Sequence, residues 1–259
     1  ERLRIAAAGQ IGIAGANYGS DGQVLTSGGS GAAVAWESLP ASTLDALSDA
    51  KSGGTDFTGS LLIGHQTTGT LDAANYNTAL GINAMDAITS GDSNVGIGYN
   101  AAGGNTSGSN NIAIGTNALL TNPTGGQNIA IGTYALNANL NDNNVAVGYS
   151  ALTANTTGAS NVAIGREALT ANTTGASNVS LGKSSMENNT TGGSNTAVGF
   201  YAFAANTTGT DNVAIGYGAL DANTTADKNT AIGYNAMTTS TTASRSVAIG
   251  WEALKDLTE

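Results

Sequence analysis

The residues of this 259-residue chain that are best suited to catalysis are its carboxylates. Enzymes that cleave polysaccharides hold two carboxylic acids about 5–9 Å apart. Most of the acidic residues here stand singly at predicted loop positions, so we expect them to be solvated and the chain not to be an enzyme. In the repetitive part of the chain they are Asp86, Asp92, Glu167, Glu187, Asp211, Asp221, Asp227 and Glu252.

Metal and thiol chemistry has few residues to draw on. The chain has one histidine, His65, and no cysteine, which excludes a zinc site built from His or thiolate ligands and a disulfide framework. A calcium-binding repeat rich in Gly and Asp is absent as well. We therefore predict no metal and no cofactor, and a structural role for His65.

Aromatic residues recur at one position of the repeat described below. A column of exposed rings can stack on sugars or bind a partner protein, and it can also pack ring on ring within the fold. The candidate receptor-binding residues are Tyr217, Tyr234 and Trp251. The full set is Tyr99, Tyr149, Phe200, Tyr217, Tyr234 and Trp251, with Tyr134 and Tyr201 beside it.

The segment Asn-Thr-Thr-Gly also recurs, and its asparagines match the acceptor pattern for N-glycosylation. We interpret the segment as turn chemistry, because Asn caps a local turn and Gly allows positive φ. The asparagines are Asn155, Asn172, Asn189, Asn206 and Asn223; the last is followed by Thr-Thr-Ala.

The charge of the chain excludes several partners. Its net charge is −10 and it has only 8 Lys and Arg residues, which argues against binding nucleic acid or an anionic membrane surface. No apolar run reaches the roughly 18 residues of a membrane span, and no signal peptide is recognisable. Since the sequence starts at Glu1 rather than Met, we expect a fragment or a processed product.

One repeat dominates the sequence from Ser60 onward. The motif Asn-Val-Ala-Ile-Gly recurs every 17 residues, except for one spacing of 16 before Asn144. The residue that this unit lacks falls in a predicted loop, where a deletion does not shift strand register. The twelve units begin at Ser60, Asn77, Asn94, Asn111, Asn128, Asn144, Asn161, Asn178, Asn195, Asn212, Asn229 and Ser246.

Each unit predicts one coil of an all-β parallel solenoid, or β-roll, of twelve coils. With the leading Asn as position 1, Val and Ile at positions 2 and 4 share one face of a strand, and we expect them to point inward. Ala and Leu at positions 8 and 9 predict a second short strand. The Asn residues of position 1 form a column that can make amide ladders. The predicted core column at position 9 is Leu119, Leu136, Leu152, Leu169, Met186, Phe203, Leu220, Met237 and Leu254.

Such a core is thin, which predicts a homo-oligomer. The small residues at positions 3 and 5 would face the partner chains and let backbones approach closely. The predicted interface residues are Ala113, Ala130, Ala146, Ala163, Ala197, Ala214, Ala231 and Ala248.

The motif from Ser246 to Ala253 resembles the YadA-like head repeat of trimeric autotransporter adhesins. That resemblance implies a left-handed β-roll with three chains around one axis. The segment Gly22–Gly29, followed by Trp36, resembles a segment common in bacteriophage tail fibres. The stretch from Leu44 to Gly64 is similar to segments that join such modules to β-roll repeats.

We accordingly predict an N-terminal β-rich module over residues 1–41, a linker over 42–59 and the β-roll over 60–259. The module holds β-prone segments at 10–14, 23–27 and 32–36, and a short helix capped by Ser42 covers 42–50.

The resemblance implies a virion protein: a tail-fibre shaft or tip that mediates host attachment. Its partners would be two further copies of the chain, other fibre or virion proteins at the termini, and a glycan or protein receptor on the host. The alternative is the head of a bacterial trimeric adhesin at the cell surface, and a polysaccharide depolymerase is a distant third.

Overall fold

The structure is a computed structural model that describes residues 74–256 continuously and, before them, the strands at 4–5, 11–12, 23–27, 34–38, 50–52 and 61–63. The chain divides into two compact units, Glu1–Ser48 and Asp49–Glu259. The helix predicted over 42–50 lies outside the described residues except for Ala50, which begins a strand, and His65 lies outside them too. In the described part no helix has the length and hydropathy needed to cross a membrane.

The first unit contains two antiparallel strand pairs. Strand β1 (Arg4–Ile5) pairs with β2 (Ile11–Gly12), and β3 (Gln23–Ser27) pairs with β4 (Val34–Ser38). Strands β2, β3 and β4 overlap the three β-prone segments expected from the sequence.

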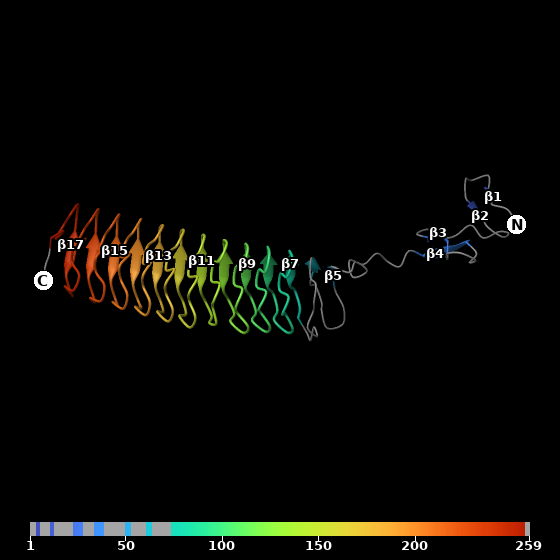
Figure 1. The fold of residues 1–259 in the computed structure, drawn as a ribbon, viewed down its shortest axis with the longest axis horizontal. Helices are drawn as coiled ribbons and strands as arrows, with labels where there is room; N and C mark the ends of the chain where they lie inside the picture. Colours follow the sequence, from blue (N-terminus) through green and yellow to red (C-terminus); the bar gives the residue numbers. More distant parts are fainter. Residues whose placement is uncertain are drawn as a thin grey trace. The chain divides into compact units, whose positions relative to one another are not determined.

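The second unit is a parallel β-solenoid (Figure 1). It opens with β5 (Ala50–Ser52), which runs antiparallel to β6 (Leu61–Ile63), and from β6 on every strand pairs in parallel with the next. The stack of twelve parallel strands confirms the predicted solenoid. After β6 the strands are β7 (Thr78–Leu80), β8 (Val95–Ile97), β9 (Ile112–Ile114), β10 (Ile129–Ile131), β11 (Val145–Val147), β12 (Val162–Ile164), β13 (Val179–Leu181), β14 (Thr196–Val198), β15 (Val213–Ile215), β16 (Thr230–Ile232) and β17 (Val247–Ile249).

The 16-residue unit leaves the strand register intact, as predicted. Ile129 lies opposite Val145 and Ala130 opposite Ala146, as in the longer coils. The deletion is absorbed in the turn around Asn141, whose backbone carbonyl accepts a hydrogen bond from the Asn139 side chain. A turn can lose a residue because no ladder partner depends on it.

Each strand from β7 to β16 is followed by a glycine whose conformation and surroundings exclude a side chain. Gly165 has φ +136°, and a Cβ there would lie 2.5 Å from the carbonyl oxygen of Gly182 in the next coil. After the glycine the chain turns back, with Glu167 and Leu169 at φ 60° and 51°. The second strand predicted at positions 8 and 9 is therefore wrong, since left-handed residues cannot continue a strand.

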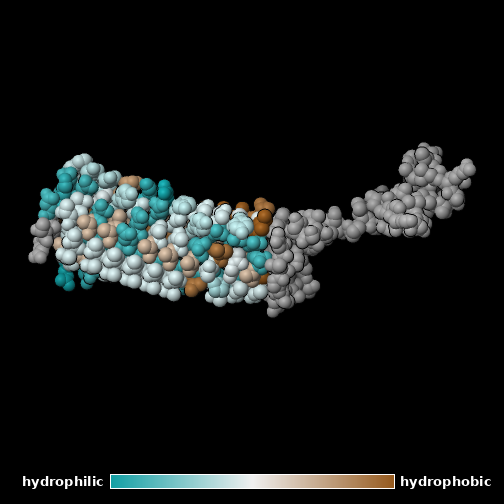
Figure 2. Space-filling view, viewed as in Figure 1, coloured by the Kyte–Doolittle hydropathy of each residue, from teal (hydrophilic) through white to brown (hydrophobic). Residues whose placement is uncertain are grey.

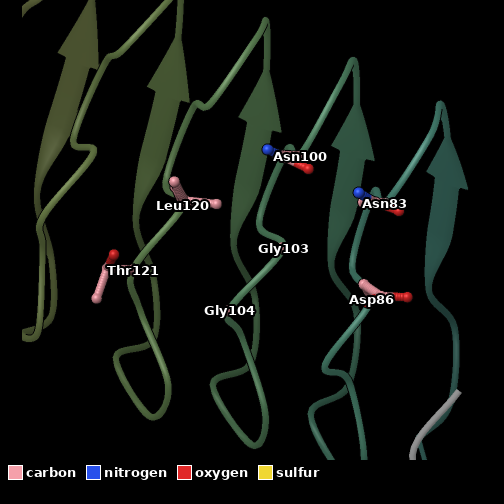
Figure 3. A pocket seen from close by; sticks show the side chains of 7 residues that line it. All are labelled: Asn83, Asp86, Asn100, Gly103, Gly104, Leu120 and Thr121. Carbon is pink, nitrogen blue, oxygen red and sulfur yellow. The ribbon is translucent and has the colours of Figure 1, made fainter. Parts of the chain in front are cut away.

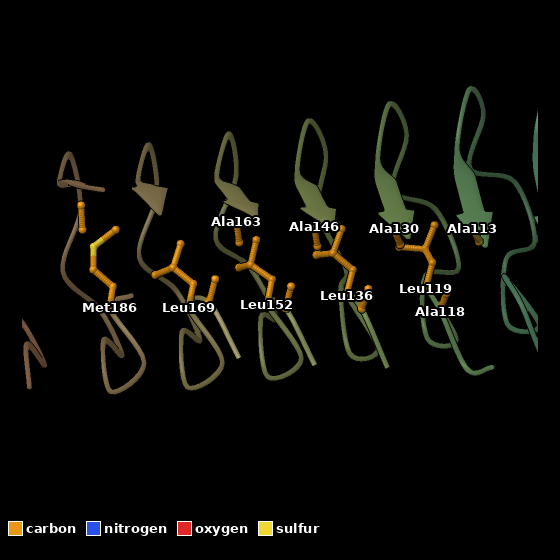
Figure 4. Packing of buried hydrophobic residues seen from close by; sticks show 14 of the residues in the cluster. Ala113, Ala118, Leu119, Ala130, Leu136, Ala146, Leu152, Ala163, Leu169 and Met186 are labelled. Atoms are coloured by element: carbon orange, nitrogen blue, oxygen red, sulfur yellow. The ribbon is translucent and has the colours of Figure 1, made fainter. Parts of the chain in front are cut away.

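The strands face the opposite way from the prediction. Ala163 is fully buried, whereas Val162 is half-buried and Ile164 is 38% exposed. Figure 4 shows the turn leucines pointing across the coil at the strand alanines. The interior is narrow: at the one strand centre that is glycine, Gly96, a Cβ would lie 3.1 Å from the Met85 side chain. The turn Leu and a methyl group fill the coil, so the branched side chains lie outside.

The Leu column itself is confirmed as the core. Its members from Leu119 to Met237 are fully buried, and Leu254 in the last described coil is 46% exposed. The alanines at position 8, such as Ala168, join it.

This orientation overturns the predicted interface. The strand alanines have no more than 2% of their surface exposed within their own chain, so they cannot contact another copy. They pack inside the coil because only a small side chain fits there; in β13 the same position holds Ser180, which is also fully buried. The residues concerned are Ala113, Ala130, Ala146, Ala163, Ala197, Ala214, Ala231 and Ala248.

A ladder of asparagines at position 1 joins the coils, as predicted. The Asn161 backbone N–H donates to Oδ1 of Asn144 at 3.0 Å, and its side-chain Nδ2 donates to the carbonyl of Gly175 at 2.9 Å. These side chains are fully buried from Asn77 to Asn229. The buried amides are thus paired with the backbone, as burial of a polar group requires.

A second ladder consists of four asparagines of the Asn-Thr-Thr segments, Asn155, Asn172, Asn189 and Asn206. Nδ2 of Asn172 donates to Oδ1 of Asn155 at 2.9 Å and to the carbonyl of Gly175 at 3.0 Å. The segment forms a turn, as predicted. Because all five asparagines that match the glycosylation pattern are fully buried, the folded chain does not offer their amides for glycosylation.

Candidate functional site

The first candidate surface is the outer face of the parallel sheet. We define the outer sheet face as the side chains at positions 2 and 4 of strands β7–β17. None of these side chains is charged, and three of them are threonines. They are half-buried or exposed, with Ile131, Ile164 and Leu181 at 36%, 38% and 42%. Single apolar residues such as those scattered over the view in Figure 2 are normal on a protein surface, but two long, mostly aliphatic columns are not.

Beside this face lies a stack of rings at position 6, which we call the aromatic column: Phe200, Tyr217, Tyr234 and Trp251. Successive ring centroids are 5.5, 5.1 and 4.2 Å apart, and the planes deviate from parallel by only 15°, 12° and 11°. Parallel strands in register hold equivalent side chains about 4.8 Å apart, which is close to the distance at which aromatic rings stack.

The structure therefore brings together the three residues predicted to bind a receptor. It also shows the ring-on-ring packing that was the alternative to receptor contact. Ring faces inside the column are covered by neighbouring rings, so each side chain presents an edge to solvent. Trp251 is 72% exposed. Receptor binding by this column stays a prediction.

In two coils nearer the middle of the solenoid, position 6 holds a cation instead of an aromatic ring. The Lys183 ammonium lies 5.1 Å from the centre of the Phe200 ring, and the Arg166 guanidinium lies 5.9 Å from that of Tyr149. Arg166 also forms an exposed ion pair with Glu167 at 2.9 Å. Sequence reasoning did not single out these cations, although they occupy the same repeat position as the aromatic rings.

Several carboxylates have structural partners. The carboxylates of Asp92, Asp142 and Asp227 each accept a backbone N–H of the preceding coil at 2.7 Å. Glu252 pairs with Lys255 at 3.1 Å, and this hydrogen bond and the charge of Glu252 raise the pKa of Lys255. Within residues 74–256 and the described strands, no group of three or more His, Cys, Asp or Glu side chains could hold a metal.

A shallow hollow lies on the turn side of three coils (Figure 3). It forms where Gly103 and Gly104 lack the side chains that Leu120 and Thr121 supply in the next coil. Its lining residues include a single carboxylate, Asp86. One carboxylate does not make the acid–base pair that glycoside hydrolysis uses.

Comparison with protein-family models, with curated proteins and with solved structures found no match.

Proposed function

We propose that this chain is a structural and adhesive component of a fibre, and that it assembles as a homotrimer through the outer sheet face. The observation that carries the proposal is an uncharged and mostly aliphatic sheet surface that continues over the eleven strands β7–β17. Apolar patches of this kind mark surfaces that other protein chains cover.

The size of the surface fits an interface between copies. Each strand from β7 to β17 offers two side chains to it, and stable interfaces use about 20–30 residues a side. Every copy repeats the same columns at the same spacing, so copies side by side match coil for coil. The number three comes from the resemblance to trimeric adhesins.

The repeated coils supply a rigid rod. Ten intervals of about 4.8 Å carry the stack over roughly 48 Å from β7 to β17. The aromatic column borders the outer sheet face, and its exposed ring edges are the surface that we propose for a host receptor. A tail fibre of a virion is the preferred setting, and the head of a bacterial surface adhesin is the alternative.

Light scattering tests the oligomer. We expect about three times the chain mass of 25.4 kDa. In the double variant Val162→Lys, Ile164→Lys the assembly should separate into single chains, because charges cannot be buried unpaired in an interface. The control is Thr174→Lys, at an exposed turn position.

A wild-type chain that is folded and monomeric would contradict the trimer. So would a double variant that keeps the wild-type mass and circular dichroism spectrum. A separate experiment addresses the setting: an antibody to this chain, imaged by negative stain on source particles, should decorate tail fibres. Decoration of bacterial cells instead would favour the adhesin head.

A further inference from the structure

The two tyrosines of the aromatic column are arranged for a covalent reaction. Tyr217 and Tyr234 lie one coil apart, each two residues after a strand, and the two strands, β15 and β16, pair in register; the ring centroids are 5.1 Å apart and the planes 12° from parallel. Both side chains are at the surface, 48% and 39% exposed. They are therefore adjacent to each other and accessible to a reagent in solution.

We propose that Tyr217 and Tyr234 are an oxidative cross-linking site, at which a peroxidase with hydrogen peroxide joins the two rings as dityrosine. This site is independent of the proposed function. Its product would be a covalent staple between neighbouring coils in a chain that has no cysteine to form a disulfide.

The reaction balances with this oxidant. Each phenol loses one electron and its hydroxyl proton, which gives two phenoxyl radicals. The radicals form one carbon–carbon bond between the two ring carbons ortho to the phenolic oxygens. The hydrogens on those carbons then move to the oxygens. Two hydrogen atoms are lost in all, and one hydrogen peroxide takes them up as two water molecules.

The neighbouring rings favour this pair. Phe200, on one side of it, has no phenol to oxidise. Trp251, on the other side, stacks on Tyr234 at 4.2 Å between ring centroids. A radical formed on the exposed indole can therefore oxidise the tyrosine. Bond formation needs the two rings to tilt toward each other, and their exposed edges leave room for it.

The chain offers comparison tyrosines. Tyr134 and Tyr149 are also close, but their centroids are 6.4 Å apart and their planes 87° from parallel. Tyr201 meets Phe200 edge-on and has no stacked tyrosine partner among the described rings. If geometry selects the pair, these residues should react far less.

The test treats the dilute full-length chain with peroxidase and hydrogen peroxide, then digests it with trypsin. Cleavage after Lys183, Lys228 and Arg245 places the two tyrosines in different peptides, 184–228 and 229–245. We expect these peptides joined, with the mass of two hydrogens lost, blue dityrosine fluorescence, and a band of single-chain size on a denaturing gel.

Matched variants decide the assignment. Tyr217→Phe and Tyr234→Phe should each reduce the fluorescence at least fivefold while preserving the ring stack, and Tyr201→Phe and Tyr134→Phe should leave it unchanged. Unfolding in urea before oxidation should remove the selectivity. The proposal is overturned if Tyr217→Phe keeps the signal, if the cross-links join only different chains, or if Tyr134 and Tyr149 cross-link equally well.

Discussion

In most coils the alanine at the centre of the strand faces a large apolar turn residue, usually leucine, across a gap that one methyl group fills. Ala163 is fully buried, and Figure 4 places it beside Leu152. Such a site has no direction in which to relax, because the strand centres of the adjacent coils, Ala146 and Ser180, are fully buried as well. Single residues thus determine the width of the coil.

Ala163→Leu should therefore destabilise the chain itself. Overpacking costs about 1–3 kcal/mol, and urea denaturation would show the loss as a lower midpoint. The control is Ile164→Ala in the same strand: at 38% exposure it should affect the folding of the single chain less. If Ile164→Ala were the less stable of the two variants, the result would favour the orientation in which the branched residues face inward.

The Asp221 carboxyl is a single group that makes the stability of the fold depend on pH. Its burial raises the pKa of this carboxyl. The folded state then binds the proton more tightly than the unfolded state, so its stability is greatest at low pH and falls as pH rises through the folded pKa. Asp221→Asn should raise the melting temperature at about pH 7 and change it little at about pH 3, below the usual range for Asp.

Asp211→Asn is the comparison for that measurement, since Asp211 is an exposed turn residue. Equal gains from the two variants at neutral pH would point to the net charge of the chain rather than to the burial of Asp221.

At the scale of elements, two asparagine ladders do what long strands do in other sheets. Strands of three residues provide few ladder hydrogen bonds. The asparagines at positions 1 and 12, such as Asn161 and Asn172, add hydrogen bonds between coils. They do so on both sides of the Asn-Thr-Thr turn. These bonds form away from water, where leaving a partner unpaired is costly.

Asn172→Ala should cost about 1–3 kcal/mol, because it removes the donor to Asn155 and leaves the amide of Asn189 without its Oδ1 acceptor. Thermal unfolding measures the loss. Thr174→Ala in the same turn is exposed and should stay within about 0.5 kcal/mol of wild type. Equal effects would show that the turn, rather than the ladder, stabilises this region.

The second unit is a one-dimensional stack, in which each described strand contacts only its neighbours along the sequence. Coils of such a stack are added along one axis, so further coils of the same chain do not cover the outer sheet face. Under the proposed assembly, stability and association are linked.

The melting temperature of the wild type should consequently rise with protein concentration, as mass action requires when folding and association are coupled. The double variant Val162→Lys, Ile164→Lys should melt at one temperature over the same range. Differential scanning calorimetry over a hundredfold dilution measures both. A wild-type melting temperature that does not move over this range would speak against assembly through the outer sheet face.

The sequence by itself determined the period, the strand in each unit, the turn at Asn-Thr-Thr and the leucine core column. Those features repeat at fixed spacing, and each follows from local chemistry: alternation, branched residues and turn residues. The alternation also identified two faces of the strand. It could not say which face lies inside, because a period of two is the same for both.

The tertiary structure decided that question: the small alanines lie inside, and the more hydrophobic branched residues lie outside. The chain turns back at a left-handed Leu169, whose side chain occupies the coil interior and leaves room only for Ala163. Val162 and Ile164 are thereby forced outward to form the outer sheet face. The second asparagine ladder and the ring stacking depend on the same closure, because they join residues that become neighbours only when one coil lies on the next.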